Sequence, residues 1–428
     1  MTAPRWRAWA AALAAGAALL AGSCMPPPSP RAAPAPPPAR GEPLIRIGLV
    51  VDQPTATFGA TGQYWVFGPD SGILAVVGPN VTWTVAPGSG MGDLRLTRPD
   101  RPVPLDVAGP VTVRPMSGAD LVVTGGHRYR GELELVRGSV GVTVVNRVPL
   151  EAYVQSVTAV ELGVTDPAVR QAVMAQAVAA RTFAVHFLGR RRALGFDLYA
   201  TVADQVYPGV DAETAPVTAA VRATAGQVET WHGQAIEALF FSTCGWSTEA
   251  ADQVFRNAPN VPYLRAVSDR FGPGKRDYYC AASPYFRWTE RWTGRELTAI
   301  LDRTLPAALG AAAAQPGQVT GIRVAKTTPT GRVAELEITT TTGTFTVPIY
   351  QVRAVLRPAP DSELASTLFQ LYVKRQGGGV AEVTAAGAGA GHGVGMCQWG
   401  AMGRARAGES YRQILTTYYP GTELGRLY

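Results

Sequence analysis

The 428-residue chain is 46% apolar and 17% charged. This composition is typical of a globular protein, and the length allows one large domain or two to three smaller ones. The formal net charge is +7, which favours acidic partners only weakly. Because Lys and Arg form no dense stripe with interleaved aromatic residues, we expect no nucleic-acid partner.

Residues 1–24 have the pattern of a secretory signal peptide. Two arginines precede an apolar run at residues 8–20, which is too short for a typical membrane-spanning helix. Small residues at 21–23 then precede Cys24, as in the lipobox of bacterial lipoproteins. We therefore expect an exported protein that is anchored to the membrane through a lipidated Cys24. The alternative is simple cleavage near this point, which would release a periplasmic or extracellular protein.

The next two segments differ in their content of strand-forming residues. Residues 25–43 are rich in Pro and Ala and predict an extended spacer that builds no core. Residues 44–145 contain short apolar or alternating runs, such as 81–85 and 140–145, that are broken by Gly and Pro. This pattern predicts a β-rich region.

Two helices are predicted at the start of the remaining region, residues 146–428. Pro149 fits a first helical turn, and apolar residues then recur at helical spacing until residues 161–163. Asp166 and Pro167 are typical of the N-cap and first position of a second helix. Alanines on one face of this second helix indicate close packing against another element.

Further elements alternate along the rest of the chain. Helices are predicted at residues 214–222, 297–309 and 411–418, strands at 228–231, 235–242 and 318–349, and a Gly-rich segment at 387–403. The alternation lacks βαβ regularity and so predicts an α+β fold. In this fold the β-rich N-terminal portion and the C-terminal strands surround a central helical core, with one boundary between residues 145 and 146.

Several common catalytic motifs are absent from the sequence. The four histidines form no His-Glu-x-x-His motif, the four cysteines form no Cys-x-x-Cys pair, and no Gly-x-Ser-x-Gly motif occurs. The glycines of residues 387–395 do not have the phosphate-binding pattern. These absences disfavour a thermolysin-like metallopeptidase, an α/β-hydrolase and a nucleotide-binding protein. We expect no cofactor.

Five other motifs carry a resemblance to a known family. They are VPLEAYV at 148–154, AQAVAARTFA at 175–184, FSTCG at 241–245, YLRAV at 263–267 and GHGVGMCQWGA at 391–401. Together and in this order they resemble the SpoIID (stage II sporulation protein D) family, which includes the LytB amidase enhancers. The resemblance spans about residues 45–425 and is most specific in the two longest motifs.

The resemblance implies a peptidoglycan lytic transglycosylase. Such an enzyme cleaves between N-acetylmuramic acid and N-acetylglucosamine and leaves a 1,6-anhydro sugar. Glu161 matches the family's acid/base position. Sporulation members prefer glycan strands stripped of stem peptides and act beside an amidase that strips them. The implied partners are therefore peptidoglycan glycan strands and a cell-wall amidase.

The position of Glu161 agrees with an acid/base role. It stands at the C-terminal end of a predicted helix, where the helix dipole and partial burial both raise the pKa of a carboxyl group. A raised pKa lets Glu protonate a leaving oxygen near neutral pH. A hydrolase usually needs a second carboxylate, whereas in a lytic transglycosylase the 6-hydroxyl of the sugar attacks. The alternative is an ordinary surface charge at a helix end.

Seven motif residues are candidates for substrate binding, namely Gln176, Arg181, Ser242, Thr243, Gly245, His392 and Gln398. Gln176 and Arg181 are five residues apart and so do not share a helix face. Arg181 either binds a sugar or muramyl carboxylate, or pairs with Glu151 or Glu161. His392 either orients the substrate or Glu161, or braces its Gly-rich loop.

The chain departs from the family at several positions. Some members bind zinc through a Cys/His loop, but the corresponding residues 200–207 include neither Cys nor His, so we expect no metal. Trp246 stands where the family often has a second glycine, and Cys397 where serine is common. Cys244 and Cys280 are predicted to form a disulfide in an oxidising environment, with two buried free thiols as the alternative.

Two non-enzymatic functions stay open at this point. The chain could bind glycan without cutting it and stimulate a wall amidase, in which case Glu161 would be dispensable. It could also be a structural lipoprotein of the cell envelope, held by Cys24 and the Pro-rich spacer.

Overall fold

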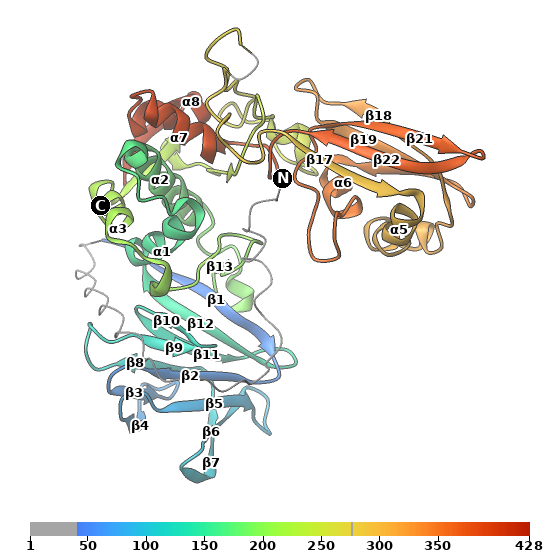
Figure 1. Ribbon diagram of the computed structural model, residues 1–428. Helices are drawn as coiled ribbons and strands as arrows, with labels where there is room; N and C mark the ends of the chain where they lie inside the picture. The colour runs from blue at the N-terminus through green and yellow to red at the C-terminus, as the bar shows by residue number, and fades with distance from the viewer. Residues whose placement is uncertain (1–40, 275–276) are drawn as a thin grey trace, which may run out of the picture. The chain divides into compact units, whose positions relative to one another are not determined.

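The computed structural model describes residues 41–274 and 277–428 (Figure 1). The predicted signal peptide with Cys24, and the spacer as far as residue 40, lie outside the described residues. Among the helices of the two described ranges, none combines the length and apolarity that are needed to cross a membrane.

The predicted β-rich region consists of strands up to the first helix, in two sheets. The strands are β1 (Leu44–Gln53), β2 (Ala56–Ala60), β3 (Tyr64–Phe67), β4 (Ile73–Val77), β5 (Thr82–Pro87), β6 (Asp93–Arg98), β7 (Arg101–Ala108), β8 (Val111–Pro115), β9 (Val122–Thr124), β10 (His127–Tyr129), β11 (Glu132–Arg137) and β12 (Val142–Pro149). One sheet has the order β13-β1-β12-β11-β8-β3-β4, where β13 is Leu198–Tyr199, and the other the order β10-β9-β2-β5-β6-β7. All pairings are antiparallel except the short parallel contact of β1 with β13.

Burial along the strands explains how these sheets are covered. In β5, Trp83 and Val85 are buried, while the alternate residues face outward, as expected for a strand with one covered face. In β12 the run from Val142 to Asn146 is buried without interruption, so both faces of this strand are covered. The polar member of the run, Asn146, is satisfied because the hydroxyl of Tyr207 donates to its side-chain oxygen at 2.8 Å.

The remaining elements mix helices with short strands. The helices are α1 (Leu150–Leu162), α2 (Arg170–His186), α3 (Ala215–Ala223), α4 (Ala251–Val254), α5 (Gly294–Leu309), α6 (Ile349–Val355), α7 (Gln398–Arg406) and α8 (Tyr411–Tyr418). The strands are β14 (Gln227–Trp231), β15 (Gln234–Ala235), β16 (Phe240–Phe241), β17 (Trp288–Thr293), β18 (Val319–Thr327), β19 (Val333–Thr340), β20 (Thr344–Pro348), β21 (Phe369–Gln376), β22 (Gly379–Gly387), β23 (Met396–Cys397) and β24 (Glu423–Arg426). Helices and strands in several sheets, after a β-rich N-terminal portion, confirm the α+β prediction.

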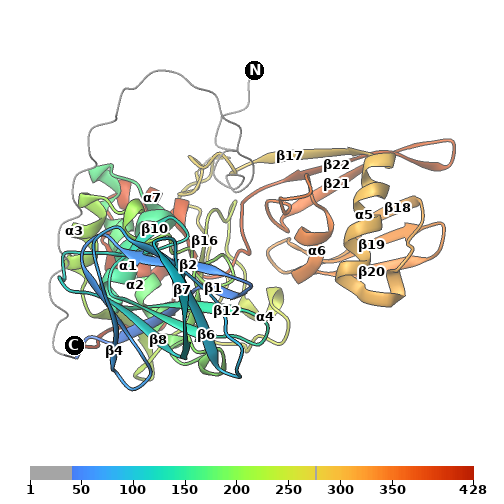
Figure 2. The same cartoon turned by 90° about the horizontal axis from the view of Figure 1, so that it is seen from below.

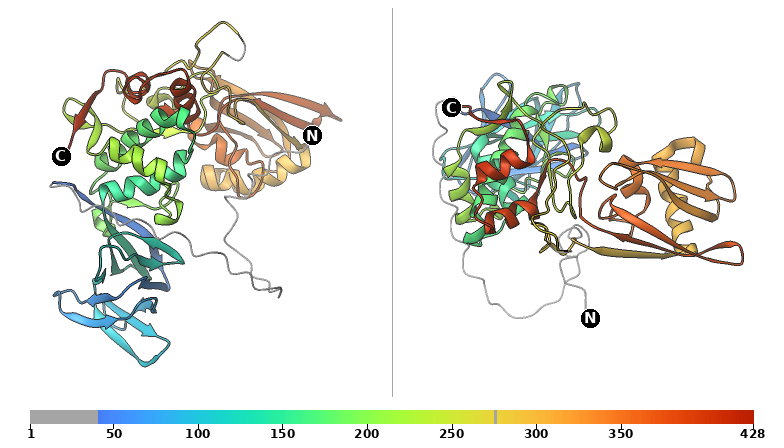
Figure 3. Two further views of the ribbon diagram at one scale, coloured as in Figure 1. Left: turned by 60° about the vertical axis from the view of Figure 1, so that its left-hand side comes forward. Right: turned by 90° about the horizontal axis from the view of Figure 1, so that it is seen from above.

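Helix α2 is central to the helical part of the fold. Every residue from Ala172 to Ala184 is buried, so the helix is enclosed on all sides and not only on the predicted face. Helices α1, α3, α7 and α8 and strand β14 pack against it, and α7 and α8 lie beside it in Figures 1 and 3. Its predicted start is confirmed, because the carboxylate of Asp166 accepts from the amide of Ala168 at 3.0 Å in the short turn that precedes α2.

The motif at residues 391–401 is joined to the helical part by a short parallel strand pairing. Phe240 in β16 pairs with Met396 in β23, and Phe241 pairs with Cys397. This places the motif around residues 241–245 beside the motif around residues 391–401. Strand β24 then pairs with β14.

A second hydrophobic core is formed by buried residues from the segment 292–385. Two three-stranded sheets, β17-β22-β21 and β18-β19-β20, provide its strands. Helix α5 packs against β17 and β22, and α6 against β19 and β20 (Figure 2). The first core extends from Ile45 to Tyr419 and includes residues on both sides of the predicted boundary at 145/146. That boundary therefore falls inside one core.

Candidate active site

Glu161 lies in the last turn of α1, as the sequence predicts. The helix ends one residue later at Leu162, and Gly163 follows as its C-cap. The side chain of Glu161 is half-buried. Burial raises the pKa of the Glu161 carboxyl group above its ordinary value, and this effect exceeds the opposing effects of hydrogen bonds from Gln398 and from the amide of Val206. The direction agrees with the sequence-based expectation.

One predicted residue, Gln398, bonds to Glu161, and a second, Gln176, lies next to Gln398. The amide nitrogen Nε2 of Gln398, the first residue of α7, donates to Oε2 of Glu161 at 3.4 Å. The same nitrogen lies 3.5 Å from Oε1 of Gln176 in α2. Gln176 is fully buried, and its own Nε2 has no hydrogen-bond partner among the described residues. Gln398 thus links the carboxyl group of Glu161 to the buried side chain of Gln176, and we name these three residues the Glu161 cluster.

Glu161 has no cationic partner within residues 41–274 and 277–428. Among the described residues it forms no ion pair, and no charged side chain contributes to the shift in its pKa. The carboxyl group can therefore hold a proton at a higher pH than a salt-bridged carboxylate could. This is the electrostatic setting that a general acid needs.

Arg181 does not join the Glu161 cluster, and its assignment as a substrate-binding residue is corrected here. Its side chain is completely buried. Its Nε and Nη2 each donate to a different oxygen of Glu151 at 2.7 Å, and Nη1 donates to the carbonyl of Gln227 at 3.1 Å. Of the interpretations drawn from the sequence, the structure shows the pairing with Glu151.

Ser242, Thr243 and Gly245 belong to a tightly packed junction. Ser242 is partly exposed, and its hydroxyl lies 3.2 Å from that of Thr243. Thr243 is buried and pairs with the hydroxyl of Ser283 at 2.6 Å. Gly245 is also buried, with a φ of +85°, and a Cβ there would lie 2.9 Å from the Cβ of Ala388. Of the three, only Ser242 offers a partly exposed side chain to a ligand.

His392 braces its loop. Its Nε2 lies 3.0 Å from the carbonyl of Phe240, and the amide of Val394 donates to its Nδ1 at 3.2 Å. The ring therefore has its proton on Nε2 and lies between the rings of Phe241 and Phe255. Burial lowers the pKa of His392 to about 4, so the ring is neutral at ordinary pH. The hydrogen bonds of His392 in the described structure are therefore made within its own surroundings and not to Glu161.

The predicted disulfide is not formed. Cys244 and Cys280 are both buried and free, and their sulfur atoms are 3.4 Å apart. The covalent bond would be about 2.05 Å long. Cys397 is the third free cysteine of the described residues, and with Asp269 it completes a buried group of four. Sequence reasoning missed Asp269, because nothing near it in the chain marks it as more than a loop residue.

Trp246, at the position where glycine is common in the family, contacts the loop between β18 and β19. Its indole nitrogen donates to the carbonyl of Thr330 in the loop between β18 and β19 at 3.1 Å. Its ring lies 3.5 Å from the position that a Cβ would take at Gly331. The substitution of glycine by Trp thus accompanies a contact that a glycine could not make.

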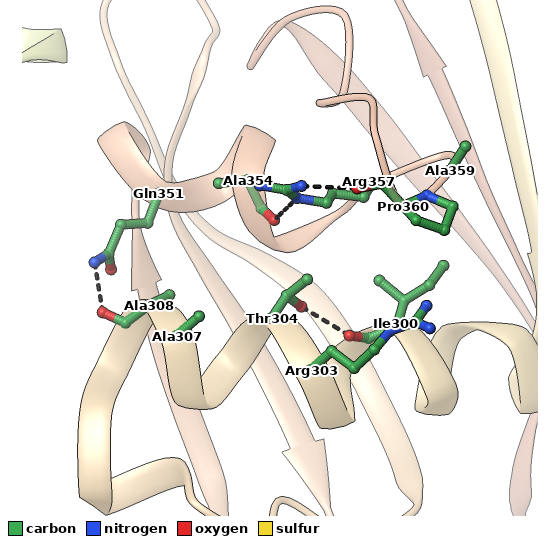
Figure 4. A pocket seen from close by; sticks show the side chains of 10 residues that line it. All are labelled: Ile300, Arg303, Thr304, Ala307, Ala308, Gln351, Ala354, Arg357, Ala359 and Pro360. Carbon is green, nitrogen blue, oxygen red and sulfur yellow. Dashed lines mark hydrogen bonds between the residues drawn. The ribbon is translucent and has the colours of Figure 1, made fainter. Parts of the chain in front are cut away.

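A pocket of about 550 Å³ occurs between α5 and α6 (Figure 4). None of the predicted site residues lines it. Two of its polar side chains form hydrogen bonds within the pocket wall. The amide of Gln351 donates to the carbonyl of Ala308 at 2.6 Å, and the hydroxyl of Thr304 donates to the carbonyl of Ile300 at 3.0 Å. The pocket therefore takes no part in the candidate site.

These observations define an α+β protein whose candidate site has one half-buried carboxyl group that accepts a hydrogen bond from a carboxamide. Comparison with known proteins identifies its family. The profile described as Stage II sporulation protein (SpoIID) matches residues 139–231, which include Glu161 and Gln176. A profile described as a domain of unknown function (DUF8618) matches residues 271–395, which include the second core.

Individual relatives support the same assignment. The chain is 32% identical over 295 residues to Stage II sporulation protein D of Bacillus subtilis, covering 65% of this chain and 75% of that protein. It is 31% identical over 306 residues to an uncharacterized protein of Brachyspira hyodysenteriae, covering 70% and 73%. It is 28% identical over 289 residues to the amidase enhancer of Bacillus subtilis, covering 59% of this chain and 38% of that protein. The chain belongs to the SpoIID family, as its motifs predict.

Proposed function

We propose that this protein is a lytic transglycosylase of peptidoglycan glycan strands, with Glu161 as the acid and then the base. The observation that carries the proposal is the setting of Glu161: a half-buried carboxyl group with a raised pKa, a hydrogen bond from Gln398 and no cation partner. This setting raises the pKa of Glu161 towards the range in which a carboxyl group can act as a proton donor, which is what the first step requires.

The reaction needs only one carboxyl group. Glu161 donates its proton to the glycosidic oxygen between N-acetylmuramic acid and N-acetylglucosamine, and the bond from that oxygen to C1 of the muramyl sugar breaks. The 6-hydroxyl of the same muramyl sugar then forms a bond to C1, and its proton passes to the Glu161 carboxylate. The products are a 1,6-anhydromuramyl end and a free N-acetylglucosamine end, with no water consumed and the acid regenerated.

Gln398 and Gln176 act as positioning residues in this proposal. Gln398 donates to Oε2 of Glu161 and is itself next to Oε1 of Gln176, so the carboxyl group has a fixed orientation. A fixed orientation matters because proton transfer needs the donor within hydrogen-bond reach of the leaving oxygen. Ser242 and His392 are the predicted substrate-binding residues that are partly exposed, and of these His392 is already bonded within its loop.

The relatives give the proposal its biological setting. Two of them are named stage II sporulation protein D and amidase enhancer, and these names support a role for this chain in cell-wall remodelling during sporulation, with a cell-wall amidase as the proposed partner. Export and a lipid anchor at Cys24 complete the proposed setting. A second candidate, a non-catalytic enhancer that binds glycan, is favoured by the name of the second of these relatives.

The test compares the wild-type chain with Glu161→Gln on purified glycan strands, both intact and stripped of stem peptides. Products are analysed by mass spectrometry for 1,6-anhydromuramyl ends. The matched control is Glu363→Gln. It makes the same substitution at an exposed carboxylate in the segment that carries the second core.

We expect anhydromuramyl ends from the wild type and the control, and none above background from Glu161→Gln. Equal product from all three chains would remove Glu161 from the chemistry. Absence of product from every chain, with glycan retained in a pull-down, would instead favour the enhancer.

A further inference from the structure

Three cysteines and one aspartate meet in the interior, away from the Glu161 carboxyl group. The thiols of Cys244, Cys280 and Cys397 and a carboxylate oxygen of Asp269 all lie within 4.8 Å of one another, and all four residues are buried. The sulfur of Cys244 is 3.4 Å from that of Cys280 and 3.4 Å from Oδ2 of Asp269. We name these four residues the cysteine–aspartate cluster. They come from four segments that are distant in the chain.

The geometry fits a tetrahedral metal ion better than a disulfide. Ligands at about 2.3 Å from a tetrahedral zinc ion are about 3.8 Å apart, close to the separations observed. A disulfide would require only two of the three sulfurs and would leave one thiol beside a buried carboxylate. Three thiolates and one carboxylate instead form a complete ligand set of the type that zinc prefers over magnesium or calcium. Because all four ligands are protein side chains, such a site would be structural.

The surroundings of Asp269 orient it as a ligand. Its Oδ1 accepts from the hydroxyl of Tyr418 at 2.6 Å and from Nη2 of Arg404 at 3.3 Å, which leaves Oδ2 facing the sulfur of Cys244. Hydrogen bonds that fix a ligating carboxylate in this way are a regular feature of metal sites. Both partners are buried with it.

The sulfur of Cys397 is likewise surrounded by donors. The backbone amides of Cys244 and Gly400 point to it at 3.1 and 3.2 Å, an arrangement that stabilises a thiolate. Arg332 is completely buried next to the cluster, and its Nη2 donates to the carbonyl of Cys244 at 3.3 Å. Its Nε and Nη1 have no hydrogen-bond partner among the described residues. The net negative charge of a zinc ion with three thiolates and a carboxylate would compensate this buried cation.

We propose that Cys244, Asp269, Cys280 and Cys397 bind one structural zinc ion. The expectation of no metal rested on residues 200–207, which are not part of this cluster. Cys397 directly precedes Gln398, and Cys244 follows Thr243, so the ion would lock together the two motifs that border the Glu161 cluster. The inference does not depend on the proposed enzymatic activity, because its readout is metal content.

The test measures metal directly. The full chain is purified with a non-thiol reductant and dialysed against a weak chelator, and its zinc content is determined by mass spectrometry of the elements. We expect about one zinc ion per chain in the wild type and at least a tenfold lower content in Cys280→Ser and Cys397→Ser. Cys24→Ser is the matched control, since it removes a thiol outside the cluster and should keep its zinc.

Two measurements on the unmodified chain keep the proposal independent of whether the variants fold. Replacement of zinc by Co²⁺ should give the absorption bands of tetrahedral thiolate coordination, and a strong chelator should lower the thermal midpoint by about 5 °C or more. A metal-free wild type that is lighter by two hydrogens, with Cys244 joined to Cys280, would overturn the proposal. A metal-free wild type in which all three thiols alkylate upon unfolding would overturn it as well.

Discussion

The two ends of α1 carry the same side chain in opposite settings. Glu151, in the first turn, receives two hydrogen bonds from Arg181 and further ones from the hydroxyl of Tyr428 and the amide of Gly226. Burial alone would raise the pKa of Glu151, but these partners more than offset it and lower the pKa below the ordinary value. Glu161, in the last turn, has burial without a cation, and its pKa is raised.

The difference teaches that partners, more than burial, separate a structural carboxylate from a reactive one. The dipole of α1 acts in the same direction, since a negative charge is favourable at the N-terminal end and unfavourable at the C-terminal end. Glu151 is therefore kept ionised and holds the buried Arg181 in place. Glu161 is kept able to carry a proton.

The largest expected effect is the loss of glycan cleavage when the carboxyl group of Glu161 is removed. Glu161→Gln should lower the rate of glycan cleavage about 100- to 10,000-fold, because it removes the proton donor. The same change should leave the free energy of unfolding within about 1 kcal/mol of the wild type, since no ion pair is broken. Product formation and urea denaturation measure the two quantities. A variant that loses activity only because it unfolds would contradict the comparison.

The next effect concerns stability. Arg181→Met should destabilise the fold by about 3–5 kcal/mol, because it leaves the carboxylate of Glu151 without its buried partner. The control is Arg353→Met, which breaks the more exposed pair with Glu363 and should cost about 1 kcal/mol or less. Denaturant unfolding compares them. If both variants lost the same free energy of unfolding, the buried Arg181–Glu151 pair would stabilise the fold no more than the exposed pair.

A smaller effect tests the hydrogen bond from Gln398. In the wild type this bond partly opposes the effect of burial on the pKa of Glu161. Gln398→Leu removes the bond, so the pKa should rise further and the alkaline limb of the kcat/KM profile should move to higher pH. Gln370→Leu, on the exposed face of β21, should leave the limb in place. A shift of the limb to lower pH would contradict the assigned role of Gln398.

The smallest effect is a pH dependence of stability that has opposite signs at the two ends of α1. The raised pKa of Glu161 gives stability that is complete below the unfolded pKa and is lost as the pH rises through the folded pKa. Glu161→Gln should therefore gain stability relative to the wild type as the pH rises above the ordinary pKa of a Glu side chain, about 4.3. The lowered pKa of Glu151 gives stability that is lost as the pH falls. The loss of stability in Glu151→Gln relative to the wild type should therefore be largest at neutral pH. Unfolding curves at several pH values measure the stability difference between each variant and the wild type. If this difference changed with pH in the same direction for both variants, the comparison would be wrong.

Local signals in the sequence predicted the long elements well. The bounds of α1, the capped start before α2 and helix α8 follow from spacing, proline and capping residues that act within one turn. Helix α7 was not predicted, because Gly400 and Gly403 lower the helical propensity of its segment. These glycines are required by packing: a Cβ at Gly400 would lie 2.1 Å from the hydroxyl of Tyr418, and one at Gly403 would lie 2.1 Å from a backbone oxygen of Tyr279.

The candidate site depended on contacts that no local pattern encodes. Glu161 and Gln398 are 237 residues apart, and only the family resemblance brought them together before the structure was known. Arg181 belonged to a specific motif but serves the fold, because motif membership does not separate a ligand-binding cation from a buried one. The approach of Asp269 to three cysteines follows from the packing of four segments that are distant in the chain, and it had no signal in the sequence.

The pairing of β17 with β22 has an evolutionary consequence. Trp288 at the start of β17 faces Gly387 at the end of β22, so the segment that carries the second core leaves and returns at neighbouring points, about 5 Å apart. A segment with this connectivity can be inserted into a host fold without separating the two residues that flank it. Here the segment also bonds to its host, because the buried Arg332 donates to the carbonyl of Cys244 and the carbonyl of Thr330 accepts from Trp246.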